Sequence, residues 1–315
     1  MRFSTIIWSM LSALTMLFSA CEHKDICLDH SHMVDMEIKF DWKAAPDATP
    51  QTMVVQFFRA DGSHYIRHEF TSANGGKIRI EAGEYKLLFH NGEMKSVDER
   101  GNTYDSYEVT TVSQSLLDPM GRGELSMPPR PAEVGDEPVC GVPENVWGGC
   151  HEQLEVLAGV AGQSVTLSPA EATAEYTIEV SNVENMSADL DISGALTGMS
   201  ESWRLADGTS SGVPVTMPLQ LERPNAHTLK VRFVSFGHCP QEEGIHYFSI
   251  YTSNKKYLDF DVTDQMHEAS DPKHVHIVID EKVTLPDPEE GMSPSIPEWD
   301  EVVQDLSLIH ISEPT

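Results

Sequence analysis

The chain has 315 residues, and its 50 Asp and Glu against 21 Lys and Arg give a formal net charge of −29 at pH 7. Nucleic-acid binding depends on Lys and Arg that displace counterions from phosphates, so this charge argues against DNA or RNA as a partner. We interpret the excess of acids as a solvated exterior.

The chain begins with a segment typical of an export signal. Met1-Arg2-Phe3 precedes an apolar run from Ile6 to Phe18 that only Ser and Thr interrupt, which predicts a signal peptide over residues 1–20. The run is shorter than the roughly 20 residues that a spanning helix requires, and no later segment approaches that length. We therefore expect no transmembrane helix in the mature protein.

The end of this segment resembles the lipobox of bacterial lipoproteins, because Ser19 and Ala20 directly precede Cys21. The resemblance implies cleavage after Ala20 and a lipid on Cys21, whose acyl chains would hold the protein at a membrane. An ordinary signal peptide beside an unrelated cysteine is the alternative. Glu22 and Asp25 lie in a short charged run similar to the surface-export signal of Bacteroidota lipoproteins. We expect an outer-membrane protein that faces the cell exterior.

The last ten residues, 306–315, resemble a translated sequencing adapter joined to a truncated reading frame. We exclude them from the fold prediction. In that case the natural C-terminus lies beyond Asp305.

The first structured block has the two-residue period of β-strands. Val34, Met36, Ile38, Phe40 and Trp42 are apolar and alternate with charged residues, which predicts a half-buried strand. Turn signals such as Asp61-Gly62 separate further strands predicted over residues 53–59, 64–70, 77–80 and 85–90. After a tether at residues 21–33, this pattern predicts an antiparallel β-sandwich over residues 34–112.

Residues 113–150 are rich in Pro and Gly and lack an apolar period, which predicts an interdomain linker. A second β-rich block has strands predicted over residues 164–167, 176–180, 188–192, 217–221, 229–236, 247–252, 257–262 and 274–279. We predict a second sandwich over residues 151–285 and an extended acidic, Pro-rich tail over residues 286–305. The whole fold is expected to be all-β, and about 285 residues suffice for two domains.

Four cysteines follow Cys21, namely Cys27, Cys140, Cys150 and Cys239. Their even number suits an exported protein with disulfides, and a Cys140–Cys150 bridge would close a Gly- and Pro-rich loop. All three pairings of the four cysteines remain open. A zinc site of four thiolates is disfavoured because no CxxC pair exists.

Three segments resemble fimbrillin-like lipoproteins of Bacteroidota, whose better-understood members are minor subunits that anchor or terminate type V fimbriae. These are the start of the mature chain at residues 21–25, the strand AGEYKLLFHN at residues 82–91, and the closing strands around FDVTDQ at residues 260–265. The resemblance implies two tandem transthyretin-like or immunoglobulin-like β-sandwiches. It also implies that an exposed sheet edge accepts a strand from a neighbouring fimbrial subunit.

Two histidine pairs are candidate metal ligands, His30 with His32 and His274 with His276. A spacing of two places both side chains on one face of a strand, so chelation is sterically feasible. We favour a flexible tether for the first pair and a solvent-facing strand edge for the second. Metal scavenging through these pairs stays open as an alternative.

Other sites of chemistry are disfavoured. Asp259, Asp261 and Asp264 lack the Gly and the terminal Glu of a calcium loop, so we assign them to an ordinary strand and its end. The sequence has no GxSxG, HExxH or phosphate-loop motif. We predict a protein that is not an enzyme, with no cofactor and no metal site.

The aromatic residues offer an alternative function. Trp42, Trp147, Trp203, Tyr247 and Tyr251 are candidate platforms for stacking sugars, although Trp42 continues an apolar face and is expected in the core. The main hypothesis is a fimbrial anchor or accessory subunit that serves assembly and adhesion. The alternative is a glycan-binding surface lipoprotein of a polysaccharide uptake system.

Overall fold

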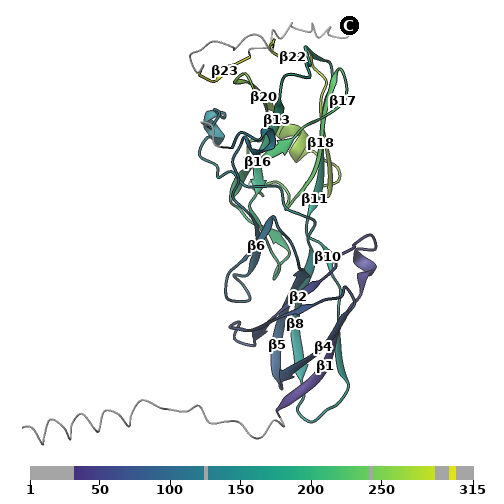
Figure 1. Cartoon of the computed structure of the whole chain (residues 1–315). Helices are drawn as coiled ribbons and strands as arrows, with labels where there is room; N and C mark the ends of the chain where they lie inside the picture. Colours follow the sequence, from purple (N-terminus) through teal and green to yellow (C-terminus); the bar gives the residue numbers. More distant parts are fainter. Residues whose placement is uncertain (1–31, 124–126, 241–243, 288–297, 303–315) are drawn as a thin grey trace, which may run out of the picture.

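The computed structural model describes residues 32–123, 127–240, 244–287 and 298–302. Figure 1 shows two lobes stacked along one long axis, with β1 and β4 at one end of the molecule and β22 and β23 at the other. The predicted all-β fold is confirmed, because strands form nearly all of the regular structure in the described residues.

The N-terminal lobe is a sandwich of two sheets. One has the order β4 (Gly75–Glu81), β1 (Met33–Phe40), β9 (Gln163–Leu167). The other has the order β10 (Ala170–Glu171), β8 (Trp147–Val156), β5 (Gly83–Asn91), β2 (Met53–Arg59), β3 (His64–Phe70). The alternation predicted for β1 is confirmed, since its apolar side chains are buried against β2 and β5 while its charged ones face outward.

The turn into β4 requires glycine. Gly75 has a φ of +87°, and a Cβ there would lie 2.2 Å from the carbonyl oxygen of Ile38. The backbones of β1 and β4 approach so closely at this point that no side chain fits.

The C-terminal lobe also has two layers. One sheet has the order β17 (Glu222–Asn225), β18 (Thr228–Ser235), β11 (Ala174–Val180), β21 (His274–Ile279). The other has the order β16 (Pro214–Gln220), β13 (Ile192–Ser200), β19 (Tyr247–Thr252), β20 (Lys256–Asp261), β23 (Asp300–Glu301). A two-stranded pair joins β12 (Val183–Glu184) to β22 (Val283–Thr284), and helix α2 (Thr263–His267) follows β20.

A third sheet and a shared core join the lobes. The sheet has the order β15 (Thr209–Ser210), β14 (Ser202–Arg204), β7 (Glu108–Thr111), β6 (Val97–Arg100). Its β6 and β7 come from the first half of the chain and its β14 and β15 from the second. One apolar cluster here includes Phe58 and Leu88 from the first half together with Leu205 and Phe236 from the second. Arg100 adds ion pairs of 2.6 Å to both Glu108 and Glu201.

The structure assigns several segments differently from the sequence prediction. β9 was expected in the second sandwich, but it pairs parallel with β1 and buries Leu167 in the N-terminal core. β8 begins inside the expected linker and pairs with β5. We therefore propose that the first sandwich ends between Glu171 and Ala174, rather than at residue 112.

The segment between β7 and β8 packs against the C-terminal lobe. It contains the short 3-10 helices η2 (Asp118–Met120) and η3 (Ala132–Val134), while a third, η1 (Trp42–Ala44), follows β1. Leu116 and Leu117 are buried with Ala195 and Tyr251 on the outer face of the β13–β19 sheet. Apolar burial therefore fixes much of the predicted linker. The prediction of a strand over residues 188–192 is wrong for residues 188–191, because β13 begins only at Ile192.

Candidate functional site

One edge of the β16–β13–β19–β20 sheet is covered by the chain itself. Residues 138–140 run beside β16, where Cys140 N–H donates to Thr216 O at 3.0 Å and Thr216 N–H donates to Pro138 O at 2.9 Å. The Glu137 carboxylate accepts hydrogen bonds from Gly198 N–H at 3.1 Å and from the Thr216 hydroxyl at 2.9 Å. Arg130 donates to the same Thr216 hydroxyl and to Glu137 O, both at 2.8 Å. These contacts close the β16 edge.

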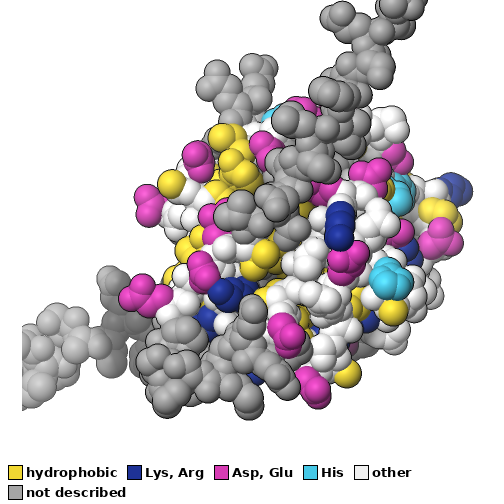
Figure 2. Space-filling view, turned by 90° about the horizontal axis from the view of Figure 1, so that it is seen from above, with side chains coloured by type: hydrophobic (Ala, Val, Ile, Leu, Met, Phe, Trp, Pro, Cys, Tyr) yellow, Lys and Arg dark blue, Asp and Glu magenta, His cyan; other side chains and the backbone are white. Residues whose placement is uncertain are grey.

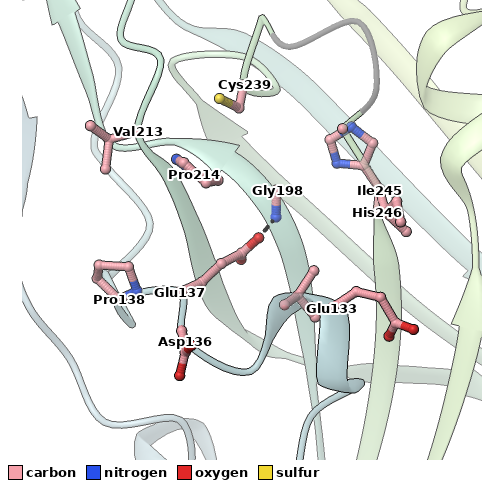
Figure 3. Close-up of a pocket in the computed structure, with 12 residues that line it drawn as sticks. Glu133, Asp136, Glu137, Pro138, Gly198, Val213, Pro214, Cys239, Ile245 and His246 are labelled. Atoms are coloured by element: carbon pink, nitrogen blue, oxygen red, sulfur yellow. Dashed lines mark hydrogen bonds between the residues drawn. The ribbon is translucent and has the colours of Figure 1, made fainter.

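A cavity of about 400 Å³ lies beside this covered edge, and Glu137, Gly198, Cys239 and His246 are among the residues that line it. Figure 3 shows the Glu137 carboxylate pointing at the Gly198 amide, with Glu133 further from that contact. Burial raises the pKa of Glu137. The Gly198 amide and the Thr216 hydroxyl both donate to this carboxylate. Its contacts therefore hold residues 138–140 in place beside β16.

The opposite edge of the same sheet, formed by β20, is only partly covered. β23 pairs parallel with β20 at Lys256 and Tyr257, where Val302 N–H donates to Tyr257 O at 2.9 Å. Lys256 Nζ lies 2.5 Å from the Asp300 carboxylate, and the ring of Trp299 packs edge-on against Tyr251 at 5.8 Å. Within the described ranges, no strand pairs with the outer side of β20 beyond Tyr257.

The open part of the β20 edge is acidic. Asp259 is partly buried and accepts a 2.5 Å hydrogen bond from the Ser249 hydroxyl, while Asp261 is exposed. Burial raises the pKa of Asp259, and the nearby Glu301 raises it further. Figure 2 looks onto the end of the molecule that carries β22 and β23 and shows acidic side chains distributed over that face. An unpaired strand edge can accept an extended segment of another chain.

The residues predicted for membrane attachment, Ala20, Cys21, Glu22 and Asp25, lie outside the described residues. None of the helices within the described ranges combines the length and the apolar character needed to cross a bilayer.

The Cys140–Cys150 bridge, one of the pairings that the sequence leaves open, is not formed in the structure, where both thiols are free. Cys140 is buried in the core of the C-terminal lobe beside β16. Cys150 lies exposed on β8, opposite Leu88 in the sheet of the N-terminal lobe. The two cysteines are ten apart in sequence, but the chain crosses from one lobe to the other between them.

His274 and His276 share the exposed face of β21, as expected, while Val275, Ile277 and Ile279 are buried on the opposite face. His274 Nδ1 lies 2.9 Å from the Asp271 carboxylate, and the Asp271 contact raises the pKa of His274. His30 of the other predicted pair lies outside the described residues.

The proposed sugar platforms differ in exposure. Tyr251 is fully buried, so its ring faces no ligand. Lys273 lies over the Trp203 ring at 5.2 Å. Trp42 packs against the N-terminal core and donates from Nε1 to Ala73 O at 2.8 Å. Trp147 lines a cavity of about 270 Å³ between the lobes.

Two features were not foreseen from the sequence. The first is the role of Glu137, which no sequence pattern indicates because Glu137 is one of 50 acidic residues in the chain. A cluster of His238, His246 and His267 also forms in the C-terminal lobe from residues on separate elements.

Comparison with known proteins identifies the family. The model of a family described as a domain of unknown function, DUF5119, matches residues 20–220. The chain belongs to this family. It is also 30% identical over 103 residues to a protein of Bacteroides ovatus named, provisionally, as the fimbrium anchoring subunit Fim4B. That match covers 32% of this chain and 30% of the relative, so it spans less than a third of either protein.

Solved structures share the fold. A candidate adhesin from Bacteroides ovatus has a TM-score of 0.60 at 17% identity and covers 86% of this chain and 98% of its own. A candidate polysaccharide-binding protein from Bacteroides thetaiotaomicron has a TM-score of 0.52 at 10% identity, covering 79% and 93%. These structures confirm the predicted β-sandwich fold. The resemblance to fimbrial proteins of Bacteroidota that the sequence predicted is confirmed by the curated relative, over the 32% of the chain that it matches.

Proposed function

We propose that this chain is a fimbrial accessory subunit of the cell surface, of the anchoring kind, and that it is not an enzyme. The sequence relationship to the provisionally named anchoring subunit Fim4B carries this proposal. The likeness of fold to a candidate adhesin over 86% of the chain supports it.

The arrangement of the lobes suits an anchor. β1 begins at Met33 at one end of the molecule, and β20 and β23 lie in the lobe at the other end (Figure 1). A lipid on Cys21, twelve residues before Met33, would hold the first lobe near the outer membrane and leave the second to project outward. The shared apolar cluster between the lobes would transmit load along the long axis.

The partner fimbrial subunit would add a strand to the open part of the β20 edge. Backbone hydrogen bonds along such an edge supply strength without any catalytic group. Asp259, Asp261 and Glu301 give this edge negative charge, so a strand that carries Lys or Arg is the better match.

Deletion of the gene and complementation in the native host test the proposal. We expect the deletion strain to shed fimbriae or to make fimbriae of altered length, and wild-type protein to restore them. Cys21→Ala should release the protein, with attached fimbriae, into the medium. Fimbriae that stay attached and normal in length after deletion would contradict the proposal.

A second set of variants tests the edge. Tyr257 O faces the outer side of β20, so the backbone of Asp259, two residues on, faces the same way. Asp259→Pro removes its outward N–H, whereas Asp259→Ala removes the same carboxylate and keeps the N–H. If strand addition occurs at β20, only the proline variant loses fimbriae while its melting temperature stays close to that of the alanine variant.

Glycan binding is the competing proposal. Tyr251 is buried and Lys273 lies over the Trp203 ring, whereas Trp147 is partly exposed and lines a cavity, so we choose Trp147 as the residue to test. Retention of the protein on immobilised polysaccharides, lost in Trp147→Ala, together with normal fimbriae in the deletion strain would favour glycan uptake.

A further inference from the structure

Three histidine rings meet in the C-terminal lobe although they come from separate elements. His238 follows β18, His246 directly precedes β19, and His267 ends α2. The ring centroids lie 5.1 Å apart for His246 and His267, and 5.7 Å apart for His238 with each of the others.

The hydrogen bonds of His246 fix the form of its ring. Its Nδ1 lies 3.1 Å from the carbonyl oxygen of Thr197, which can only accept, so Nδ1 carries the proton. The Nε2 atom is then left with a lone pair, which points at His267. Metal-binding histidines have the same arrangement: one ring nitrogen donates to a backbone carbonyl, and this hydrogen bond orients the other nitrogen toward the metal.

The pair already has the spacing of two metal ligands. His246 Nε2 and His267 Nε2 are 3.2 Å apart. Two imidazole nitrogens bound at about 2.0–2.1 Å to a tetrahedral zinc ion are separated by roughly 3.3 Å. Without a metal, this contact is a hydrogen bond in which His267 Nε2–H donates to His246 Nε2, and a cation would take the place of that hydrogen.

We propose that His238, His246 and His267 form a binding site for a divalent transition-metal ion, with zinc the best match to neutral imidazole donors. No group of three His, Cys, Asp or Glu among the described residues is placed to hold a metal ion as the side chains stand. The site therefore forms when the half-buried ring of His238 turns toward the His246–His267 pair. His267 is exposed, so a fourth position stays open to water.

Calorimetric titration of the chelator-treated mature chain with Zn²⁺ tests this inference. We expect one Zn²⁺ per chain and a rise in melting temperature when Zn²⁺ is added. His267→Ala and His238→Ala should each weaken binding at least about tenfold, the loss that removal of an outer-shell partner alone can cause. His267 is exposed, so its replacement leaves the fold intact, which a circular dichroism spectrum checks.

The two histidine pairs evident in the sequence are matched controls. The double variants H274A/H276A and H30A/H32A should bind Zn²⁺ as the wild type does. Absence of stoichiometric binding, or equal binding in His267→Ala and the wild type, would overturn the proposal. Loss of binding in either control double variant with retention in His267→Ala would also overturn it.

Discussion

Replacement of Glu137 by alanine should destabilise the C-terminal lobe. The carboxylate accepts hydrogen bonds from Gly198 N–H and from the Thr216 hydroxyl, and Gly198 and Thr216 are both buried. A buried donor without an acceptor costs about 1–3 kcal/mol. Arg130 donates to the Thr216 hydroxyl and cannot accept its proton, so this O–H group also loses its acceptor. We expect a loss of about 2–4 kcal/mol in the free energy of unfolding.

Urea denaturation followed by far-UV circular dichroism measures this loss. The matched control is Glu133→Ala, because Glu133 is exposed on the neighbouring η3 and should change stability by less than about 0.5 kcal/mol. Hydrogen exchange supplies a local readout, since the amide of Gly198 should exchange faster in Glu137→Ala only. Equal stability and equal exchange in the two variants would refute the role given to this carboxylate.

Other predictions concern a buried base, the N-terminal core and the free thiols. The pKa of His246 is about 4 in the folded protein against an ordinary 6.5, so the unfolded chain takes up a proton first as the pH falls. Stability should therefore fall between pH 6.5 and pH 4, by up to about 3 kcal/mol from this group. A denaturation series in which His246→Asn shows the same slope as the wild type would disprove this. Ile38→Ala should cost about 2–5 kcal/mol by chemical denaturation, because the side chain is fully buried. Ile66→Ala, on a side chain that is 37% exposed, should cost about 1 kcal/mol or less. A thiol reagent should label exposed Cys150 rapidly in the native protein and buried Cys140 only after unfolding, whereas a bridge between them would block both.

The sequence predicts those parts of the fold that depend on local patterns. In β1, apolar and charged residues alternate and burial follows that alternation, and in β21 the predicted face of Val275, Ile277 and Ile279 is buried. β13 was only partly foreseen, because all of its nine residues are buried and several are small, so no period appears. The sequence prediction assigns β9 to the second sandwich, which is wrong. Its partner β1 lies more than a hundred residues earlier in the chain, and parallel pairing over such a separation leaves no local sequence signal.

The candidate sites also divide into those that a local sequence motif indicates and those that only the tertiary structure brings together. The predicted attachment at Cys21 depends on a short local motif and stays a prediction. The open edge of β20 follows from the order of strands in a sheet, which no single strand reveals. His246 and His267 are 21 residues apart, and only the return of the chain through β19, β20 and α2 brings them together.

The central claim is that a fimbrial subunit pairs with the outer edge of β20. Photo-crosslinking in intact cells, from an aryl azide amino acid placed at position 259, tests it most directly. The account predicts a crosslinked product that contains this chain and a fimbrial subunit, absent when the same residue is placed at Ile66 of β3 in the other lobe. Crosslinks to an outer-membrane importer, or no crosslink from position 259 in fimbriated cells, would contradict it.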